Sequence, residues 1–284
     1  MSDATAGKPE GAAVPAGAAT GYDPRPPVWR PGRGVEALSG AYRQLFEVVA
    51  ARSGPVSARF SPIGEFTVPG DPDSTACALT AAHHAGIPIP LHPGIEKLYN
   101  PGTGCYRTFM LERDGSLSTN IHMVELLNLT GEHERRDTVL QWLHEKIVTN
   151  GNCHCKWHIS LMYALGEAAR VLASISTTTA LDIRAKAVER LLELQHQDGG
   201  WGVLDSTVEE TAYAALGICA AADTHNELST LNSAHKFLRS ADMDLAPRWI
   251  GETLYCLEPL VPSLHQTALT RIRQVLREPK STTP

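Results

Sequence analysis

The sequence has no long apolar run and no excess of basic residues. No stretch approaches the ~20 consecutive apolar residues that a helix needs to cross a bilayer. The N-terminus lacks the basic region and apolar core of a signal peptide. The formal net charge of −6 gives no electrostatic footprint for nucleic acid. These absences predict a cytoplasmic protein with no transmembrane segment and no nucleic-acid partner.

Cysteines are also few, with six scattered among 284 residues. Several fall within helical patterns, so we expect reduced, buried small hydrophobes rather than a disulfide framework. The hydrophobic share of 43% and the charged share of 20% are ordinary for a soluble globular protein. The length suffices for one large domain or two small ones.

The sequence also lacks a convincing alternation of apolar and polar residues, the pattern of a β-strand. Apolar residues recur instead at helical spacing. One expected helix starts at residue 116. The others cover about residues 35–52, 72–86, 133–148, 160–173, 178–195, 207–221, 229–240, 248–257 and 262–276. Such amphipathic, Ala-rich pairs must stack on their neighbours to bury their faces, which an open solenoid and a closed α/α barrel both allow. The predicted fold class is therefore all-α.

Composition divides the chain into three parts. Residues 1–34 are rich in Ala, Gly and Pro and lack apolar periodicity, which predicts a disordered arm. The helical patterns lie in residues 35–278, and residues 279–284 form a short tail. We therefore expect one helical domain over residues 35–278.

Two carboxylates stand at the start of one apolar helix, in Asp71-Pro72-Asp73-Ser74. Asp71 suits the N-cap and Pro72 suits the first helical position, where a missing N–H costs nothing. Asp73 then falls in the first turn. An ordinary capped helix explains these residues as well, because such start signals recur in most helical proteins.

A second motif runs from Gln195 through Gly199 to Trp201. A Gln near a helix C-terminus can bond the terminal carbonyls, a Gly pair permits the turn, and Trp packs on the next helix. By itself this motif indicates a structural brace between helices.

Four blocks follow one another in the order, and at about the spacing, of the motifs of a known enzyme family. They are Asp71-Pro72-Asp73-Ser74-Thr75-Ala76, Ser116-Leu117-Ser118-Thr119-Asn120-Ile121-His122, Lys156-Trp157-His158-Ile159-Ser160, and Gln197-Asp198-Gly199-Gly200-Trp201-Gly202 with Glu209-Glu210-Thr211-Ala212-Tyr213. Together they resemble the class II terpene cyclases of the β-domain type, which include copalyl and drimenyl diphosphate synthases and, more distantly, squalene–hopene cyclases. The resemblance spans about residues 55–276 and implies an α/α-barrel fold.

The resemblance implies proton-initiated cyclisation of a linear prenyl diphosphate, with the diphosphate retained. Carried over, Asp73 is the general acid and Asp71 is its neighbour in the motif. Either His122 or Asn120 would bond the acid and orient its proton, and His122 is preferred. An alkene is a very weak base, so the donor must be a strongly acidic carboxylic acid whose carboxylate is stabilised after proton transfer.

The same resemblance proposes residues that line the substrate. Aromatic candidates for cation–π stabilisation of the carbocation are Trp157, Trp201, Tyr213, Tyr106 and Phe109. Candidates for gripping the diphosphate are Arg107, Arg113 and Lys156, while Ser74 and His158 belong to the matching blocks. Core packing for the aromatic residues and solvated charge for the basic ones are the ordinary alternatives.

Departures from the family pattern leave several alternatives open. Ser74 stands where the family usually has a carboxylate, which favours farnesyl over geranylgeranyl diphosphate without excluding the latter. Glu252 stands in a weaker terminal block, at a position where the family often has Lys. No acidic segment for Mg²⁺ is evident, so Mg²⁺ is expected only through the substrate diphosphate. The chain is shorter than a two-domain cyclase, so a homodimer or a second chain could cap the cavity. A catalytically silent binding barrel, and a cyclase of a non-diphosphate polyene or prenylated aromatic, are the rival functions.

Two further patterns bear on metals and on the reaction type. A Cys153-His154-Cys155 run followed by His158 offers ligand types for zinc, but at an unusual spacing, so zinc is not expected. No Asp-Asp-x-x-Asp sequence occurs. Because that signature belongs to cyclases that ionise a diphosphate, its absence favours protonation of an alkene.

Overall fold

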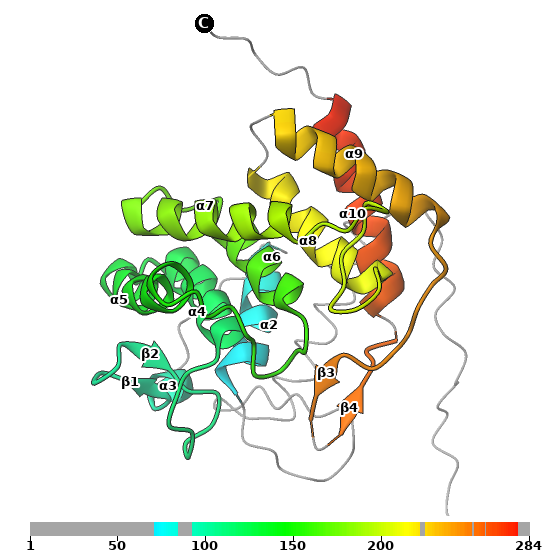
Figure 1. Cartoon of the computed structure of the whole chain (residues 1–284). Coiled ribbons are helices and arrows are strands. Elements are labelled where there is room, and N and C mark those ends of the chain that lie inside the picture. Colours follow the sequence, from blue (N-terminus) through cyan, green and yellow to red (C-terminus); the bar gives the residue numbers. More distant parts are fainter. Residues whose placement is uncertain (1–70, 85–92, 222–224, 252, 259, 278–284) are drawn as a thin grey trace, which may run out of the picture.

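The structure is a computed structural model, and it describes residues 71–84, 93–221, 225–251, 253–258 and 260–277. Helices dominate (Figure 1): α2 (Pro72–His84), α3 (Pro93–Glu96), α4 (Leu117–Thr130), α5 (His133–His144), α6 (Leu161–Leu172), α7 (Thr178–Glu193), α8 (Val208–Ala221), α9 (His225–Ser240) and α10 (Leu260–Arg277). A π-helical turn, Glu145–Thr149, continues α5. Two antiparallel hairpins pair β1 (Tyr99–Asn100) with β2 (Cys105–Tyr106) and β3 (Trp249–Ile250) with β4 (Leu254–Tyr255).

Most expected helices are confirmed, with boundaries shifted by a few residues, as for α9, which begins four residues earlier than predicted. The arm at 1–34, the helix near 35–52, the position of Glu252 and the tail at 279–284 lie outside the described residues. The division into arm, domain and tail therefore stays a prediction.

The prediction of a helix at 248–257 is wrong, because this segment forms the β3–β4 hairpin. Arg248 N–H donates to Tyr255 O at 3.1 Å, and Ile250 N–H donates to Trp157 O at 2.9 Å. The first bond lies within the hairpin, and the second comes from a segment distant in the chain, which no local helical pattern reveals. The strands of both hairpins are only two residues long, too short for alternation to register in the sequence.

The helices form two layers, an inner row and an outer row. In the inner row, α2 packs on α4, α4 on α6, α6 on α8, and α8 on α10. Helices α4, α6 and α8 are buried along most of their length, because each packs against at least three neighbouring helices. In the outer row, α5, α7 and α9 bury one face each, and Figure 1 shows them at the periphery.

Two glycines allow α6 and α8 to approach closely. A Cβ on Gly166 would lie 2.4 Å from Tyr213 O, and one on Gly217 would lie 2.7 Å from Gly166 Cα. No side chain fits between these backbones, so the glycines set the distance between the helices. The approach places the ring of Tyr163 on α6 beside that of Tyr213 on α8, with centroids 4.9 Å apart.

Trp201 braces the turn between α7 and α8. Its fully buried indole N–H donates to Leu191 O of α7 at 2.7 Å. The Gln195 amide donates instead to Gly199 O in the turn, at 2.9 Å, and to Thr230 O of α9, at 3.0 Å. The prediction of a structural brace is confirmed, although the contact with the terminal carbonyls of α7 comes from the Trp rather than from the Gln.

All six cysteines lie among the described residues, and all are free thiols. Four are buried as expected, but Cys256 is only partly buried and Cys77 is exposed, which corrects the prediction for these two. None of the described helices is both long enough and apolar enough to cross a membrane.

Replacing Gly166 by Ala should lower the free energy of unfolding by about 1–3 kcal/mol, the usual cost of overpacking. The better helix propensity of Ala offsets at most about 1 kcal/mol of the clash. Urea unfolding followed by circular dichroism measures the change. Gly102→Ala is the control, because its Cβ would meet only the Asn100 side chain at 3.4 Å. An equal loss in both variants would contradict the close helix approach.

Candidate active site

The first turn of α2 positions one carboxylate as a cap and projects the next one inward. Asp71 Oδ1 accepts a hydrogen bond from Ser74 N–H at 2.7 Å, which confirms its capping role. Burial and the negative charge of Asp73 raise the pKa of Asp71, although the bond from Ser74 opposes the rise. Asp73, two residues later, points toward α4.

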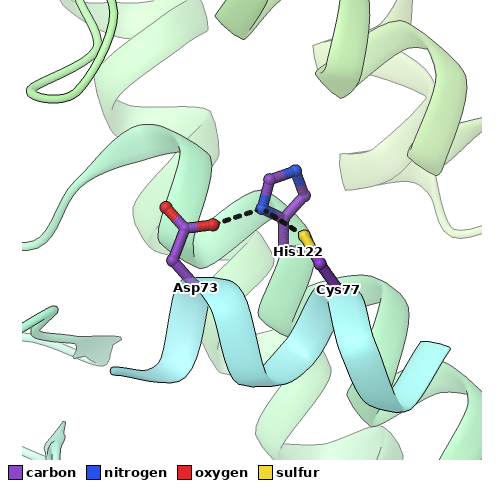
Figure 2. Close-up of side chains that lie close together, drawn as sticks. All are labelled: Asp73, Cys77 and His122. Atoms are coloured by element: carbon purple, nitrogen blue, oxygen red, sulfur yellow. Dashed lines mark hydrogen bonds and ion pairs between the residues drawn. The ribbon is translucent and has the colours of Figure 1, made fainter. Parts of the chain in front are cut away.

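Three donors from α4 converge on Asp73. Ser118 Oγ–H donates to Asp73 Oδ2 at 2.9 Å, and Thr119 Oγ1–H donates to the same oxygen at 3.1 Å. The other oxygen, Oδ1, pairs with His122 Nδ1 in a very short contact (Figure 2). Ser118 and His122 are four residues apart, so they lie on one face of α4, and the donors surround the carboxylate.

Asn120 does not contact the acid, contrary to the alternative raised from the sequence. Its Oδ1 accepts from Tyr106 N–H at 2.7 Å, and its amide donates to Tyr106 O and to Ser116 O, both at 2.9 Å. The side chain therefore fastens strand β2 to the start of α4. Its role in the structure is to hold the helix that carries His122.

The two hydroxyl groups that donate to Asp73, those of Ser118 and Thr119, each contact a further side chain. Thr108 Oγ1 accepts from the Trp157 indole N–H at 3.2 Å and lies 3.0 Å from Thr119 Oγ1. Cys155 Sγ–H donates to Ser118 Oγ at 3.3 Å. Both chains run donor to acceptor toward the carboxylate, an arrangement in which each bond polarises the next.

His122 continues into a chain of alternating charges. Its Nε2 lies 3.6 Å from Glu167 Oε2 on α6, and Glu167 pairs with Arg170 at 2.7 Å. Arg170 also reaches Glu125 on α4 at 3.1 Å. Cys77, one turn along α2 from Asp73, places Sγ 3.3 Å from His122 Nδ1.

These contacts shift the protonation of the pair. Burial raises the pKa of Asp73, but the charge and hydrogen bond of His122, with the two hydroxyls, outweigh burial and hold that pKa below its usual range. Burial lowers the pKa of His122, but the sulfur of Cys77 and the charge of Asp73 raise it well above 6.5. Burial also raises the pKa of Glu167, yet Arg170 and His122 bring it down to about 2.

Aromatic rings adjoin the pair on the side of α6 and α8. The ring of Tyr163 lies 6.5 Å from that of His122, 4.9 Å from that of Tyr213 and 5.0 Å from that of Trp249. His158 also joins this group, 4.9 Å from Tyr163, and it is buried beside Glu209, whose Oε1 accepts from the Trp249 indole. Burial raises the pKa of Tyr163 well above 10, so its phenol stays neutral.

The remaining predicted residues divide between this region and other places. Phe109 packs edge-on against Trp157, with ring centroids 5.7 Å apart. Tyr106 is fully buried and directs its hydroxyl to Glu96, within hydrogen-bond distance of Arg135, so the structure places it in the β1–β2 hairpin. Trp201, as described above, is a brace.

The three basic candidates lie on or beside the loop that precedes α4. Arg113 is exposed, and Lys156 donates to Asp114 O and lies 3.8 Å from Glu112. Arg107 is half-buried, and its buried Nε has no hydrogen-bond partner in the described part of the chain.

The residues considered for zinc do not come together. Cys155 contacts Ser118, whereas His158 packs in the aromatic group. Among the described residues, the one group of three metal-ligand side chains is instead Asp73, Cys77 and His122.

Sequence reasoning missed several residues of this region. Ser118 and Thr119 stand in one of the family-like blocks, but the sequence assigned them no role. Trp249 was missed because residues 248–257 were expected to form a helix. Tyr163 and Glu167 are four residues apart on the buried face of α6. A Glu within an otherwise apolar, Ala-rich helix, three residues before Arg170, was the available signal, because such a charge needs a buried partner.

The squalene–hopene cyclase C-terminal domain family matches residues 114–246. The labda-7,13-dienyl diphosphate synthase of Streptomyces clavuligerus is 30% identical over 251 residues, which cover 84% of this chain and 45% of the relative. These matches confirm the resemblance to the class II terpene cyclases.

A second relative agrees in sequence, and a solved structure agrees in fold. The ent-copalyl diphosphate synthase of Streptomyces sp. KO-3988 is 34% identical over 203 residues, or 66% of this chain and 38% of the relative. The solved structure of ent-copalyl diphosphate synthase from Streptomyces platensis superposes with a TM-score of 0.67 at 22% identity, over 86% of this chain and 49% of that chain. The α/α fold is thereby confirmed. The chain spans less than half the length of these relatives.

The Asp73–His122 pair should make stability depend on pH in a defined window. A lowered Asp73 pKa contributes stability above 3.8 and loses it as pH falls through the folded value. A raised His122 pKa contributes below 6.5 and loses it as pH rises through the folded value. The loss of unfolding free energy in His122→Gln should therefore be greatest between about pH 4 and pH 6.5.

Urea unfolding of both proteins across the pH range measures this loss. His154→Gln, an exposed histidine outside the site, is the control. A His122→Gln deficit that does not decline toward either end of the pH range would contradict the ion pair.

Proposed function

We propose that the protein protonates a terminal alkene of a linear prenyl diphosphate and cyclises it with the diphosphate retained. Asp73 is the general acid. The observation that carries the proposal is the donor set around Asp73, in which Ser118, Thr119 and His122 all bond the same carboxyl group. Three donors stabilise the carboxylate that remains after the proton has left, which makes Asp73 a strong acid.

Asp73 needs both a low pKa and a proton at the moment of reaction. An apolar chain lying over the carboxyl group removes water and favours its neutral form. His122, whose pKa is raised by Cys77 and Asp73 and whose Nε2 lies 3.6 Å from Glu167, then stabilises the anion as the proton moves to the alkene. A strong acid is required because an alkene is a very weak base, so the pair supplies the driving force for proton transfer.

The aromatic group beside His122 suits the carbocation that follows. The ring centroid of Tyr163 lies 4.9 Å from that of Tyr213, 5.0 Å from that of Trp249 and 6.5 Å from that of His122. A desolvated cation over such a face gains about 2 kcal/mol. Neutral phenols also avoid trapping the cation by an anionic oxygen, consistent with the raised pKa of Tyr163.

The diphosphate lies at the opposite end of the linear substrate from the terminal alkene, and it requires cations there. Arg107 is the leading candidate, because it is half-buried and its buried Nε has no hydrogen-bond partner in the described part of the chain. Both relatives named above are diphosphate synthases, which supports a prenyl diphosphate substrate. Ser74 in the acid motif favours farnesyl diphosphate, with geranylgeranyl diphosphate as the second substrate to test.

Mg²⁺ enters this proposal only with the substrate diphosphate. The one group of metal-ligand side chains among the residues described contains a thiol and an imidazole. Mg²⁺ prefers oxygen ligands in octahedral geometry, so this group does not suit it. No step is assigned to Mg²⁺.

Asp73→Asn should abolish cyclisation, with turnover falling by at least about 10³-fold, because the amide keeps the shape but has no acidic proton. Purified protein is incubated with farnesyl and geranylgeranyl diphosphates, treated with phosphatase, and its products are analysed. Ser74→Ala is the matched control next to the acid and should retain cyclisation. Wild-type turnover by Asp73→Asn would exclude Asp73 as the acid, and no turnover of any polyene would favour a silent binding barrel.

Tyr163→Leu should reduce turnover by about 30-fold, the equivalent of about 2 kcal/mol of lost cation–π stabilisation. Tyr163→Phe keeps the ring and should remain within a few-fold of the wild type. Steady-state kinetics on the substrate found above separates the two. Equal losses in both variants would show that the hydroxyl, rather than the ring, is what the reaction needs.

A further inference from the structure

Cys77 is the one side chain of the cluster in Figure 2 that the proposed reaction does not use. Its Sγ, one Asp73 carboxylate oxygen and His122 Nδ1 all lie within 4.8 Å of one another. Asp73 and Cys77 are four residues apart, so both project from the same face of α2. His122 approaches from α4 and meets them both (Figure 2).

These three groups are the ligand types of a zinc site. Thiolate, imidazole and carboxylate are the usual protein ligands of Zn²⁺, and three of them with a fourth position open is a common arrangement. A soft thiolate selects Zn²⁺ or Cd²⁺ over Mg²⁺ and Ca²⁺. Because Cys77 is exposed, an ion can reach the group from solvent.

The surroundings of the three groups also match a metal site, independently of the ligand types. A histidine that binds a metal through one nitrogen usually directs the other to a carboxylate, which fixes the ring. Here His122 Nε2 lies 3.6 Å from Glu167, which Arg170 holds in place, and Nδ1 faces Asp73 and Cys77. Ser118 and Thr119 bond Asp73 Oδ2 and leave Oδ1 toward the same point.

We infer that Asp73, Cys77 and His122 bind a thiophilic divalent cation such as Zn²⁺, and that the bound ion inhibits proton donation by Asp73. Binding releases the thiol proton of Cys77 and the Nδ1 proton of His122, and no electrons move. The ion then occupies the carboxylate oxygen and the imidazole nitrogen that the acid needs. The binding half stands on geometry alone, whereas the inhibition half rests on the proposed function.

Cd²⁺ titration of the whole protein tests the binding half, because a Cd²⁺–thiolate bond absorbs in the near ultraviolet. The wild type should gain this absorbance at one equivalent, and excess Mg²⁺ should not prevent it. Cys77→Ala should lose the absorbance, and Asp73→Asn should bind at least about tenfold more weakly. Cys256→Ala, which removes a partly buried thiol outside the site, should behave as the wild type.

Equal absorbance and affinity in the wild type and Cys77→Ala would overturn the inference, as would no Cd²⁺–thiolate absorbance in the wild type. Isothermal titration with Zn²⁺ repeats the comparison for the ion itself. Both readouts are independent of turnover, so they decide the site even if no polyene is cyclised.

Turnover with and without Zn²⁺ tests the inhibition half. Zn²⁺ should inhibit the wild type and Cys256→Ala at concentrations at least about tenfold below those that inhibit Cys77→Ala, and a chelator should restore activity. Identical inhibition of all three proteins would overturn regulation at this site. A wild type that never turns over would instead count against the proposed function.

Discussion

The buried pair of Asp73 and His122 is the interaction on which the site depends. Its partners come from α2 and α4, 49 residues apart in the chain and adjacent in the inner row of helices. Taking both charges out of water costs several kcal/mol for each ion, and removing one partner from such a pair costs about 3–5 kcal/mol. The surrounding structure can be understood as the means by which this pair is kept together.

Compensation comes from two directions. On the carboxylate side, Ser118 and Thr119 satisfy Asp73 Oδ2, and each hydroxyl is held by a further donor. On the imidazole side, charges alternate from His122 through Glu167 and Arg170 to Glu125. Each charge in this series therefore faces an opposite one, which is the condition under which burial is tolerated.

The packing of α6 supports both the acid and the aromatic group. Gly166 lets α6 lie against α8, which brings Tyr163 beside Tyr213, while Glu167 on the next position reaches back to His122. Trp249 completes the group from the β3–β4 hairpin, held by Glu209. A single helix thereby links the proposed proton donor to the rings proposed to stabilise the cation.

The sequence by itself determined the helical class, most helix positions and the capped start of α2. It also indicated His122 as the preferred partner of Asp73. These are local or motif-borne features, since helical period, caps and block order are all written along the chain. Only the tertiary structure decided that Asn120 holds β2 rather than the acid, that residues 248–257 form a hairpin, and that Tyr163, Glu167 and Cys77 adjoin His122. Each of these depends on which segments distant in the chain pack together, because a polar side chain or a free backbone N–H takes the partner that packing brings within about 3 Å.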